Sequence, residues 1–230
     1  MIEVKNVSKK YKKIKALDNI SFNIQEGKIT CILGTNGVGK STILKAISGL
    51  IRVDSGEIFI DKEKLNNNTY NKLSFVPDID THFTQLTIKE SFEFMKIFYT
   101  NWDNNKAYEM LELFNLTEDR VISSLSKGNK ARVKIILGFA QNAKYTLLDE
   151  PFSGIDIFTR EKFIETIAKY MQDHQSIIIT THEIAEIEMI VDDVILIDNG
   201  KVVCEFNAEE TRQNEGMSIV DKMREVFRGE

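Results

Sequence analysis

The sequence has few cysteines, no long hydrophobic run and no excess of basic residues. Its two cysteines, Cys31 and Cys204, both lie in apolar segments typical of strands, which favours buried reduced thiols over disulfide bonds. No run approaches the roughly 20 apolar residues that a membrane-spanning helix needs, and the first ten residues hold no apolar signal-peptide core. A net charge of −5 gives no field that favours nucleic acid. We therefore expect no nucleic-acid partner.

Residues 34–42, Gly-Thr-Asn-Gly-Val-Gly-Lys-Ser-Thr, match the phosphate-binding pattern G-x-x-x-x-G-K-[ST] at every fixed position. An apolar segment of strand type precedes them at residues 28–33, and an amphipathic helical segment follows at residues 42–50. Glycines let backbone N–H groups converge on a phosphate, and the helix N-terminus adds partial positive charge. Lys40 is expected to reach the β- and γ-phosphates, and Ser41 to ligate Mg²⁺. The candidate triphosphate-binding residues are Gly34, Asn36, Gly37, Val38, Gly39, Lys40, Ser41 and Thr42.

The rest of the chain alternates between strand-like and helix-like segments. Apolar segments of strand length occupy residues 2–4, 20–24, 28–33, 57–60, 73–76, 145–148, 176–180, 194–197 and 202–206. From a capping box at Thr87 and Glu90 onward, apolar residues recur at helical spacing. These patterns predict an α/β fold, with a P-loop NTPase core that has a mostly parallel sheet and N-terminal antiparallel β-strands. Residues 1–86 and 143–230 would form this core, and residues 87–142 an inserted helical subdomain.

A second apolar strand, at residues 145–148, ends in Asp149 and Glu150. Because side chains alternate along a strand, these two carboxylates point in different directions and suit different tasks. Asp149 suits the outer shell of Mg²⁺, and Glu150 suits a general base acting on the attacking water. His182 follows a third such strand, at residues 176–180. A phosphate loop, paired carboxylates and a histidine after neighbouring strands together indicate hydrolysis of a nucleoside triphosphate.

With these motifs in this order, the chain resembles the ATP-binding subunit of an ABC transporter from Tyr11 to about residue 206. The resemblance implies that Tyr11 stacks on adenine and that His182 contacts the γ-phosphate and orients the water. Residues 125–129, Leu-Ser-Lys-Gly-Asn, stand at the family's signature position. There, Ser126 and Gly128 would bind the ATP that a second subunit holds. Asp156, in the motif of residues 153–156, would lie in the loop that crosses between subunits.

The chain departs from the family pattern at two places. The family usually has Gln after Val76-Pro77, where this sequence has Asp78. Asp is one methylene shorter and, at neutral pH, only accepts hydrogen bonds, so Asp78 is expected to ligate Mg²⁺ without donating to water. Lys127 and Asn129 replace the usual Gly and Gln of the signature motif. Lys127 either adds a cation near the partner's phosphates or is a surface lysine without a role.

The resemblance implies a subunit that binds and hydrolyses ATP, and powers movement of a solute through a separate transmembrane permease subunit, in the direction of export. Two such subunits, identical or related, would close head-to-tail around two ATP molecules and open after hydrolysis. The chain would then lie at the cytoplasmic face of the cell membrane as a peripheral protein. The permease would dock near Asp78, where aromatic residues gather: Phe83, Phe92, Phe94, Phe98, Tyr99 and Trp102.

Two other functions stay open at this point. A soluble ABC ATPase that acts on nucleic acid or ribosomes would share these motifs, although such relatives usually carry paired cassettes, a coiled-coil insertion or a charged linker, and the sequence shows none. An unrelated P-loop kinase or GTPase would leave residues 125–129 and His182 unexplained, and the sequence has no N-K-x-D guanine motif. Dimerisation that depends on ATP would separate the kinase or GTPase from the other readings.

Overall fold

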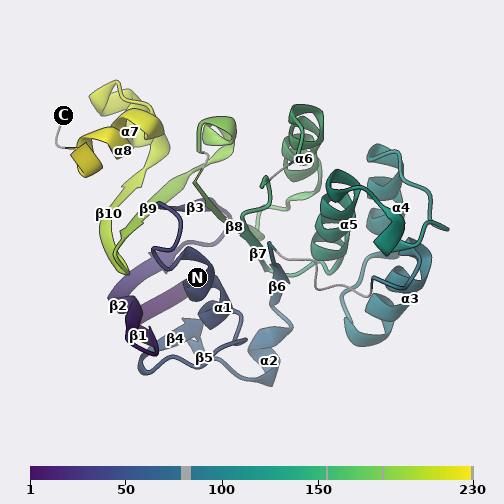
Figure 1. Ribbon diagram of the computed structural model, residues 1–230, viewed down its shortest axis with the longest axis horizontal. Coiled ribbons are helices and arrows are strands. Elements are labelled where there is room, and N and C mark those ends of the chain that lie inside the picture. Colours follow the sequence, from purple (N-terminus) through teal and green to yellow (C-terminus); the bar gives the residue numbers. More distant parts are fainter. Residues whose placement is uncertain (79–83, 154, 183, 229–230) are drawn as a thin grey trace.

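The computed structural model describes residues 1–78, 84–153, 155–182 and 184–228. The described strands form two sheets, one in the order β2-β1-β4-β5 and one in the order β10-β9-β3-β8-β7-β6 (Figure 1). The strands are β1 (Ile2–Tyr11), β2 (Ile14–Ile24), β3 (Ile29–Leu33), β4 (Ser55–Ile60), β5 (Glu63–Lys64), β6 (Leu73–Val76), β7 (Tyr145–Asp149), β8 (Ser176–Thr181), β9 (Asp193–Asp198) and β10 (Lys201–Asn207). The helices are α1 (Lys40–Ile47), α2 (Asn67–Tyr70), α3 (Ile88–Phe98), α4 (Asn104–Leu113), α5 (Lys127–Ala140), α6 (Ile157–Tyr170), α7 (Ala208–Glu215) and α8 (Ile219–Arg228), with 3₁₀ turns η1 (Ile122–Ser124), η2 (Ile184–Glu186) and η3 (Glu188–Ile190).

The larger sheet is parallel except at one edge. Strand β3 pairs in parallel with β8 and β9, and β7 pairs in parallel with β8 and β6. Among the described strands of this sheet, only β10 runs antiparallel, after a turn in which Asn199 and Gly200 have φ angles of 46° and 74°. Positive φ at both residues is what a type I′ hairpin requires. Because β3, β7 and β8 are parallel neighbours, the residues that follow them meet at the same edge of the sheet.

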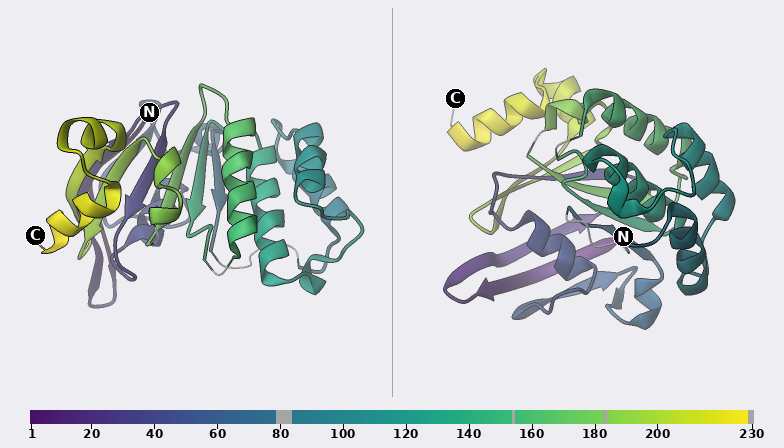
Figure 2. Two further views of the ribbon diagram at one scale, coloured as in Figure 1. Left: turned by 90° about the horizontal axis from the view of Figure 1, so that it is seen from above. Right: turned by 45° about the vertical axis from the view of Figure 1, so that its right-hand side comes forward.

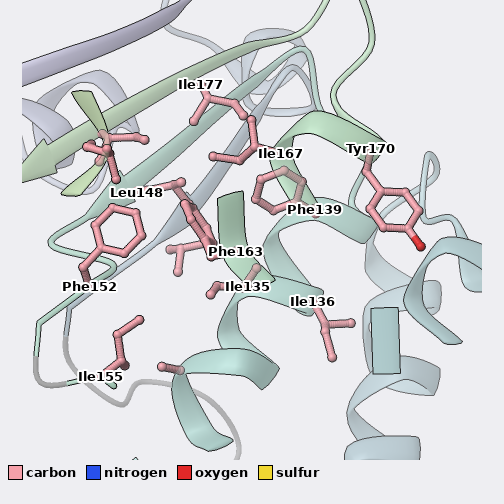
Figure 3. Packing of buried hydrophobic residues seen from close by; sticks show 14 of the residues in the cluster. Ile135, Ile136, Phe139, Leu148, Phe152, Ile155, Phe163, Ile167, Tyr170 and Ile177 are labelled. Atoms are coloured by element: carbon pink, nitrogen blue, oxygen red, sulfur yellow. The ribbon is translucent and has the colours of Figure 1, made fainter. Parts of the chain in front are cut away.

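Two hydrophobic clusters cover the faces of the parallel sheet. Ile32 of β3 belongs to the cluster shared with α1 and the antiparallel sheet, whereas Cys31 and Leu33 belong to the cluster shared with α5 and α6. Figure 3 shows the second cluster, in which the ring of Phe163 packs edge-on against the ring of Phe152 with centroids 4.8 Å apart. The predicted burial of Cys31 is confirmed, but Cys204 is only half-buried on the edge strand β10.

Helices α3, α4 and α5 lie together at one end of the molecule, away from the antiparallel sheet (Figures 1 and 2). They fall within the predicted helical insert of residues 87–142. The predicted capping box is present at α3, because the Thr87 N–H donates to Glu90 Oε2 at 2.8 Å and the Glu90 N–H donates to Thr87 Oγ1 at 3.1 Å. The predicted α/β fold, with a mostly parallel sheet and a separate antiparallel sheet, is thus confirmed.

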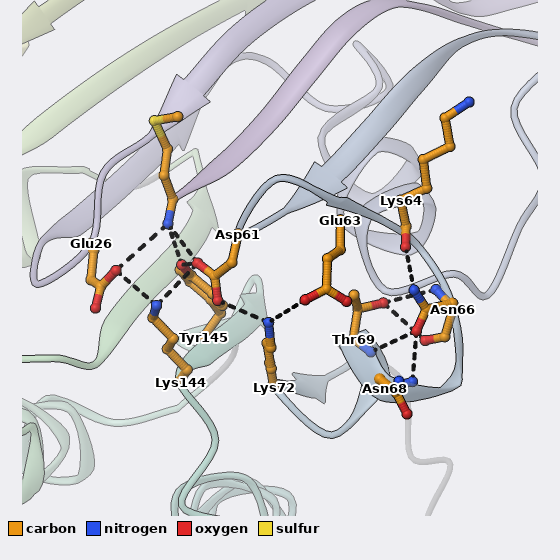
Figure 4. Close-up of polar contacts among 11 residues, drawn as sticks. Glu26, Asp61, Glu63, Lys64, Asn66, Asn68, Thr69, Lys72, Lys144 and Tyr145 are labelled. Atoms are coloured by element: carbon orange, nitrogen blue, oxygen red, sulfur yellow. Dashed lines mark hydrogen bonds and ion pairs between the residues drawn. The ribbon is translucent and has the colours of Figure 1, made fainter.

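A polar cluster links the turn after β4 to the start of β7 (Figure 4). Asp61 accepts hydrogen bonds from Tyr145 Oη at 2.6 Å and Lys144 Nζ at 3.0 Å, and it pairs with Lys72 Nζ at 3.2 Å. Burial alone would raise the pKa of the Asp61 carboxyl, but these donors and the N-terminal ammonium outweigh burial and hold that pKa well below its usual value. The cluster therefore joins the two sheets through a charged carboxylate.

The C-terminal helices α7 and α8 pack beside the turns η2 and η3, which follow β8. Arg212 Nη2 donates to the backbone oxygen of Glu188 at 2.7 Å, and the Ile219 N–H donates to Glu188 Oε1 at 2.6 Å. Among the described residues, the helices are too short or too polar for any of them to cross a bilayer.

Candidate functional site

The loop between β3 and α1 lies so close to neighbouring backbone that two of its positions require glycine. A Cβ on Gly34 would lie 2.3 Å from the backbone oxygen of Ile197, and a Cβ on Gly39 would lie 2.3 Å from that of Ala16. Gly39 also has a φ of 113°, in the region that favours glycine. Asn36 and Gly37 form the exposed top of the loop, and a Cβ on Gly37 would meet nothing within 4 Å. This loop is therefore open to solvent on its outer side, at Asn36 and Gly37.

The remaining candidates of the phosphate loop lie at the start of α1. Val38 is buried in the cluster beneath the loop, while Ser41 and Thr42 are half-buried in the first helical turn. Lys40 is only 5% exposed, and its Nζ donates to the backbone oxygens of Gly34 at 2.8 Å and Thr35 at 3.2 Å. The ammonium group thus lies inside the loop, where it would meet a bound phosphate.

Asp149, at the end of β7, is held by two hydroxyl groups. Ser41 Oγ and Thr180 Oγ1 both donate to Asp149 Oδ1 at 2.8 Å, and Asp149 is 3% exposed. Hydroxyl and carboxylate oxygens are ligands that Mg²⁺ accepts in proteins. Among the described residues there is no group of three or more His, Cys, Asp or Glu that could hold a metal ion. This donor set fits Mg²⁺, which usually takes few protein ligands and completes its shell with phosphate oxygens and water.

The two carboxylate oxygens of Glu150 contact a lysine and a histidine. Its Oε1 lies 3.1 Å from Lys40 Nζ, and its Oε2 lies 2.9 Å from His182 Nδ1. The backbone of Glu150 has a φ of 46°, and its N–H bonds to the backbone oxygen and the hydroxyl of Thr180 at 3.0 and 3.1 Å. The ends of β7 and β8 therefore fix both the position and the direction of the Glu150 carboxylate.

Six residues that follow or end β3, β7 and β8 are called the strand-end group: Lys40, Ser41, Asp149, Glu150, Thr180 and His182. Thr180 was not among the predicted site residues, although its strand was predicted. The parallel register places Thr180 opposite Asp149, and this pairing is what brings the hydroxyl to the carboxylate. The signal in the sequence was a pair of threonines that follows three consecutive isoleucines at the end of the strand.

Asp78 stands on the exposed side of a cavity of about 270 Å³ that Glu150 and Lys127 also line. Lys134 of α5 donates from Nζ to the backbone oxygens of Pro77 at 3.2 Å and Asp78 at 2.7 Å. Asp78 and Glu150 therefore line the same cavity. Ligation of Mg²⁺ by Asp78 stays a prediction.

Three residues stand at the starts of two neighbouring helices and are called the partner-facing group after the role expected of them: Ser126, Gly128 and Asp156. Ser126 caps α5 through a hydrogen bond from the Asn129 N–H at 3.3 Å, and Asp156 caps α6 through one from the Thr159 N–H at 3.0 Å. A Cβ on Gly128 would lie 3.7 Å from Asp156 Oδ2, so the two helix starts are adjacent. Gly154, in the predicted crossing loop, lies outside the described residues.

Tyr11 ends β1, and its side chain is substantially exposed. Lys9 Nζ lies 5.8 Å from the centre of its ring. An aromatic ring that is open to solvent and adjoins a lysine suits stacking against a flat base, and its role in adenine binding stays a prediction.

Comparisons with known proteins agree with this geometry. The family model described as ABC transporter matches residues 17–153. The chain is 32% identical to the petrobactin import ATP-binding protein YclP of Bacillus subtilis (strain 168), over 91% of this chain and 88% of that protein. It is 28% identical to the lipopolysaccharide export system ATP-binding protein LptB of Haemophilus influenzae, over 100% of this chain and 98% of that protein.

A solved structure extends this likeness to the fold and its chemistry. The dimeric ATP-binding cassette MJ0796, in a post-hydrolysis state bound to ADP and Pi, superposes with a TM-score of 0.80. It is 29% identical to this chain, over 90% of this chain and 98% of that one. With the family model covering more than half of the residues, the chain belongs to the ABC transporter family as an ATPase cassette that binds ATP with Mg²⁺.

Proposed function

We propose that this chain powers solute transport through a separate transmembrane subunit, and that the strand-end group performs its ATP hydrolysis. One observation carries the second part: Glu150 is held between His182 and Lys40 at the rim of the phosphate loop. Names of relatives on both the import and the export side support the first part.

The ionic contacts suggest how each side chain acts. A triphosphate in the loop would draw the Lys40 ammonium onto its β- and γ-phosphate oxygens and release Glu150 from that contact. Glu150 would then accept a proton from the attacking water, a contribution typically worth about 10²–10⁴-fold in rate. His182, 2.9 Å from Glu150 Oε2, would keep the carboxylate aimed and would contact the γ-phosphate. Bound Mg²⁺ would supply charge neutralisation on the phosphates, with Ser41 and Asp149 holding it.

The partner-facing group supports the closure of two chains around ATP. Ser126 is exposed at the N-terminus of α5, where backbone N–H groups and the helix dipole attract an anion. Next to it, Ile157 and Phe158 at the start of α6 are 60% and 70% exposed. Exposed apolar side chains beside an anion-binding helix start fit a surface that a second chain covers. A head-to-tail pair of identical chains would form two equivalent sites.

An apolar groove of about 690 Å³ is the proposed docking site for the transmembrane subunit. It lies among α1, α2, β6 and the end of α3, and Leu50, Tyr70, Phe75 and Tyr99 contribute to its walls. Leu50 is 63% exposed, as is Phe98 nearby on α3. A groove of this kind suits the apolar face of a helix from the partner.

The aromatic residues predicted to receive the permease differ in their exposure. Phe83 and the neighbouring His82 lie outside the described residues. Phe92 is fully buried and belongs to the core, and Trp102 and Phe94 are half-buried against it. Phe98 and Tyr99 are therefore the described aromatic residues of that set with surface to offer a partner.

Copurification tests the docking groove. Leu50→Asp, at the exposed end of the groove, should abolish recovery of a membrane protein with the tagged chain, because it places a charge on an apolar contact surface. Met189→Asp is the matched control, since Met189 is more exposed but lies away from the groove. Equal recovery with both variants would contradict the groove as the docking site.

We propose export as the direction of transport. The full-length match to an export subunit and the Asp78 and Lys127 departures support this direction. Loaded vesicles that carry the chain with its copurified membrane protein, with ATP supplied on the side of the ATPase, would settle the direction. Movement of solute away from the ATPase side agrees with export, and the opposite movement excludes it.

The ATPase proposal is tested with Glu150→Gln. This variant should bind ATP as tightly as the parent protein, because the loop is unchanged, but its turnover should fall by about 10²–10⁴-fold. It should also accumulate dimers with ATP and Mg²⁺ in sedimentation velocity. Turnover like that of the parent protein would exclude Glu150 as the base.

A further inference from the structure

The Arg132 guanidinium joins elements that are far apart in the sequence. From α5, its Nε and Nη2 donate to Thr159 Oγ1 of α6 at 3.2 and 2.5 Å. Its Nη1 donates to the backbone oxygen of Phe114, which follows α4, at 3.3 Å and to Asn129 Oδ1 at 3.2 Å. One planar side chain thus ties α4, α5 and α6 together.

The Thr159 hydroxyl uses its whole hydrogen-bonding capacity. A hydroxyl has one donor and two acceptor sites. Thr159 Oγ1 accepts from Arg132 Nε and Nη2, and it donates to Asp156 Oδ2 at 2.7 Å. Thr159 is fully buried, so no water competes for these sites. The hydroxyl therefore serves as a fixed link between Arg132 and Asp156.

The two ends of this chain of hydrogen bonds are members of the partner-facing group. At one end, Asn129 accepts from Arg132 through its side chain and donates its N–H to Ser126 Oγ at 3.3 Å. At the other end, the Asp156 carboxylate lies beside Gly128. Hydrogen bonds from Thr159, with the nearby charge of Arg132, hold the pKa of Asp156 below its usual value, so this carboxylate is charged at neutral pH.

We propose that Arg132 and Thr159 are positioning residues that make Ser126 and Asp156 act as one rigid surface toward the second chain. The inference rests on the proposed closure of two chains around ATP. Helix starts on a protein surface lose freedom when a partner covers them, and that loss weakens association. A link that already fixes the two starts relative to each other reduces the loss. Asn129, a departure from the family pattern, is part of this link because its short side chain reaches Arg132.

Thr159→Val in the Glu150→Gln background is the direct test, because valine keeps the shape and removes all three hydrogen bonds. The matched control is Thr166→Val on the same helix. Thr166 is equally buried, but its hydroxyl donates only within α6, to the backbone oxygen of Lys162 at 2.7 Å. With ATP and Mg²⁺, Thr159→Val should raise the dissociation constant of the dimer about tenfold relative to the control. ATP binding to the monomer should be equal in both.

The outcomes separate this inference from the function on which it rests. If the Glu150→Gln parent protein stays monomeric with ATP, the two-chain closure is wrong and this inference falls with it. If that parent dimerises, and Thr159→Val and Thr166→Val have equal dimer dissociation constants, only the inference is overturned.

Asn129→Ala is a second variant for the case in which Thr159→Val does not fold. It removes one Arg132 contact from a half-exposed position and leaves the Thr159 link intact. It should weaken the dimer less than Thr159→Val, by about threefold. Combined with Arg132→Met, Asn129→Ala should not raise the dissociation constant of the dimer further, because both substitutions break the same link. Additive effects of the two substitutions would overturn the inference.

Discussion

The strand-end group and the partner-facing group differ in burial and in what surrounds them. Lys40 and Asp149 are almost fully buried, and hydrogen bonds within the chain hold both side chains. Ser126 and Asp156 are exposed, and each holds the start of a helix. The first group is fixed by the register of parallel strands, and the second is fixed by helix caps and by Arg132.

This difference separates two properties that mutations should affect independently. A buried group that one chain completes should govern nucleotide affinity and chemistry. An exposed group at the starts of two helices should govern association of two chains. Substitutions in the two groups test that separation.

Lys40→Ala should have the largest effect, because it removes the buried ammonium from the phosphate loop. We expect ATP affinity of the monomer to fall by about 10–100-fold, as expected for lost hydrogen bonds to a charged group. Equilibrium titration with a fluorescent ATP analogue measures this. Unchanged affinity would show that the loop binds phosphate without Lys40.

Ser126→Asn should separate the two groups, because Asn caps a helix as well as Ser does. The monomer should therefore keep its melting temperature and its ATP affinity. Steady-state ATPase activity should fall about tenfold, since the larger amide replaces the hydroxyl that is proposed to face the second chain. A fall in the ATP affinity of the monomer would instead show that the groups are not independent.

Asp78→Gln should alter the response to metal. A neutral amide binds Mg²⁺ more weakly than a carboxylate, so the Mg²⁺ concentration for half-maximal ATPase activity should rise about threefold or more. The same titration with Asp54→Asn, a carboxylate that pairs with Lys9 away from the site, serves as control. No change in rate or in Mg²⁺ response would exclude a role of Asp78 in metal binding.

Asp61→Asn should affect stability rather than activity, because Asp61 lies in the cluster that joins the two sheets. At pH 7 we expect a loss of about 1–3 kcal/mol in the free energy of unfolding. The folded-state pKa of Asp61 is lowered, so its stabilisation is fully present above the ordinary Asp pKa of about 3.9 and disappears as the pH falls toward the lowered value. Urea unfolding of Asp61→Asn should therefore show a weaker loss of stability on acidification than the parent protein.

The sequence predicted those parts of the molecule that local patterns determine. The C-terminal ends of β3, β7 and β8 were predicted to within one residue. In each case an apolar run stops shortly before a residue of the site, namely Gly34, Asp149 and His182. Helix α6 was not predicted, since its first residues Ile157 and Phe158 are apolar yet exposed and disturb the helical pattern.

Contacts between distant segments were beyond prediction for a different reason. Arg132 and Thr159 are 27 positions apart, and nothing in the residues near either one indicates that they meet. Only the packing of α5 against α6 brings the guanidinium to the hydroxyl. Likewise, the sequence shows a threonine at position 180, but its bond to Asp149 depends on the pairing of β7 with β8.

The left-handed backbone at Glu150 implies a conflict between ease of folding and reactivity at the centre of the molecule. Glycine or asparagine adopts such a φ readily, whereas glutamate holds it at a cost on the order of 1–3 kcal/mol. A glycine at this position would relieve that strain, but it would leave no carboxylate to pair with Lys40 or to accept a proton. The pairing of the strands around Glu150 must offset that cost.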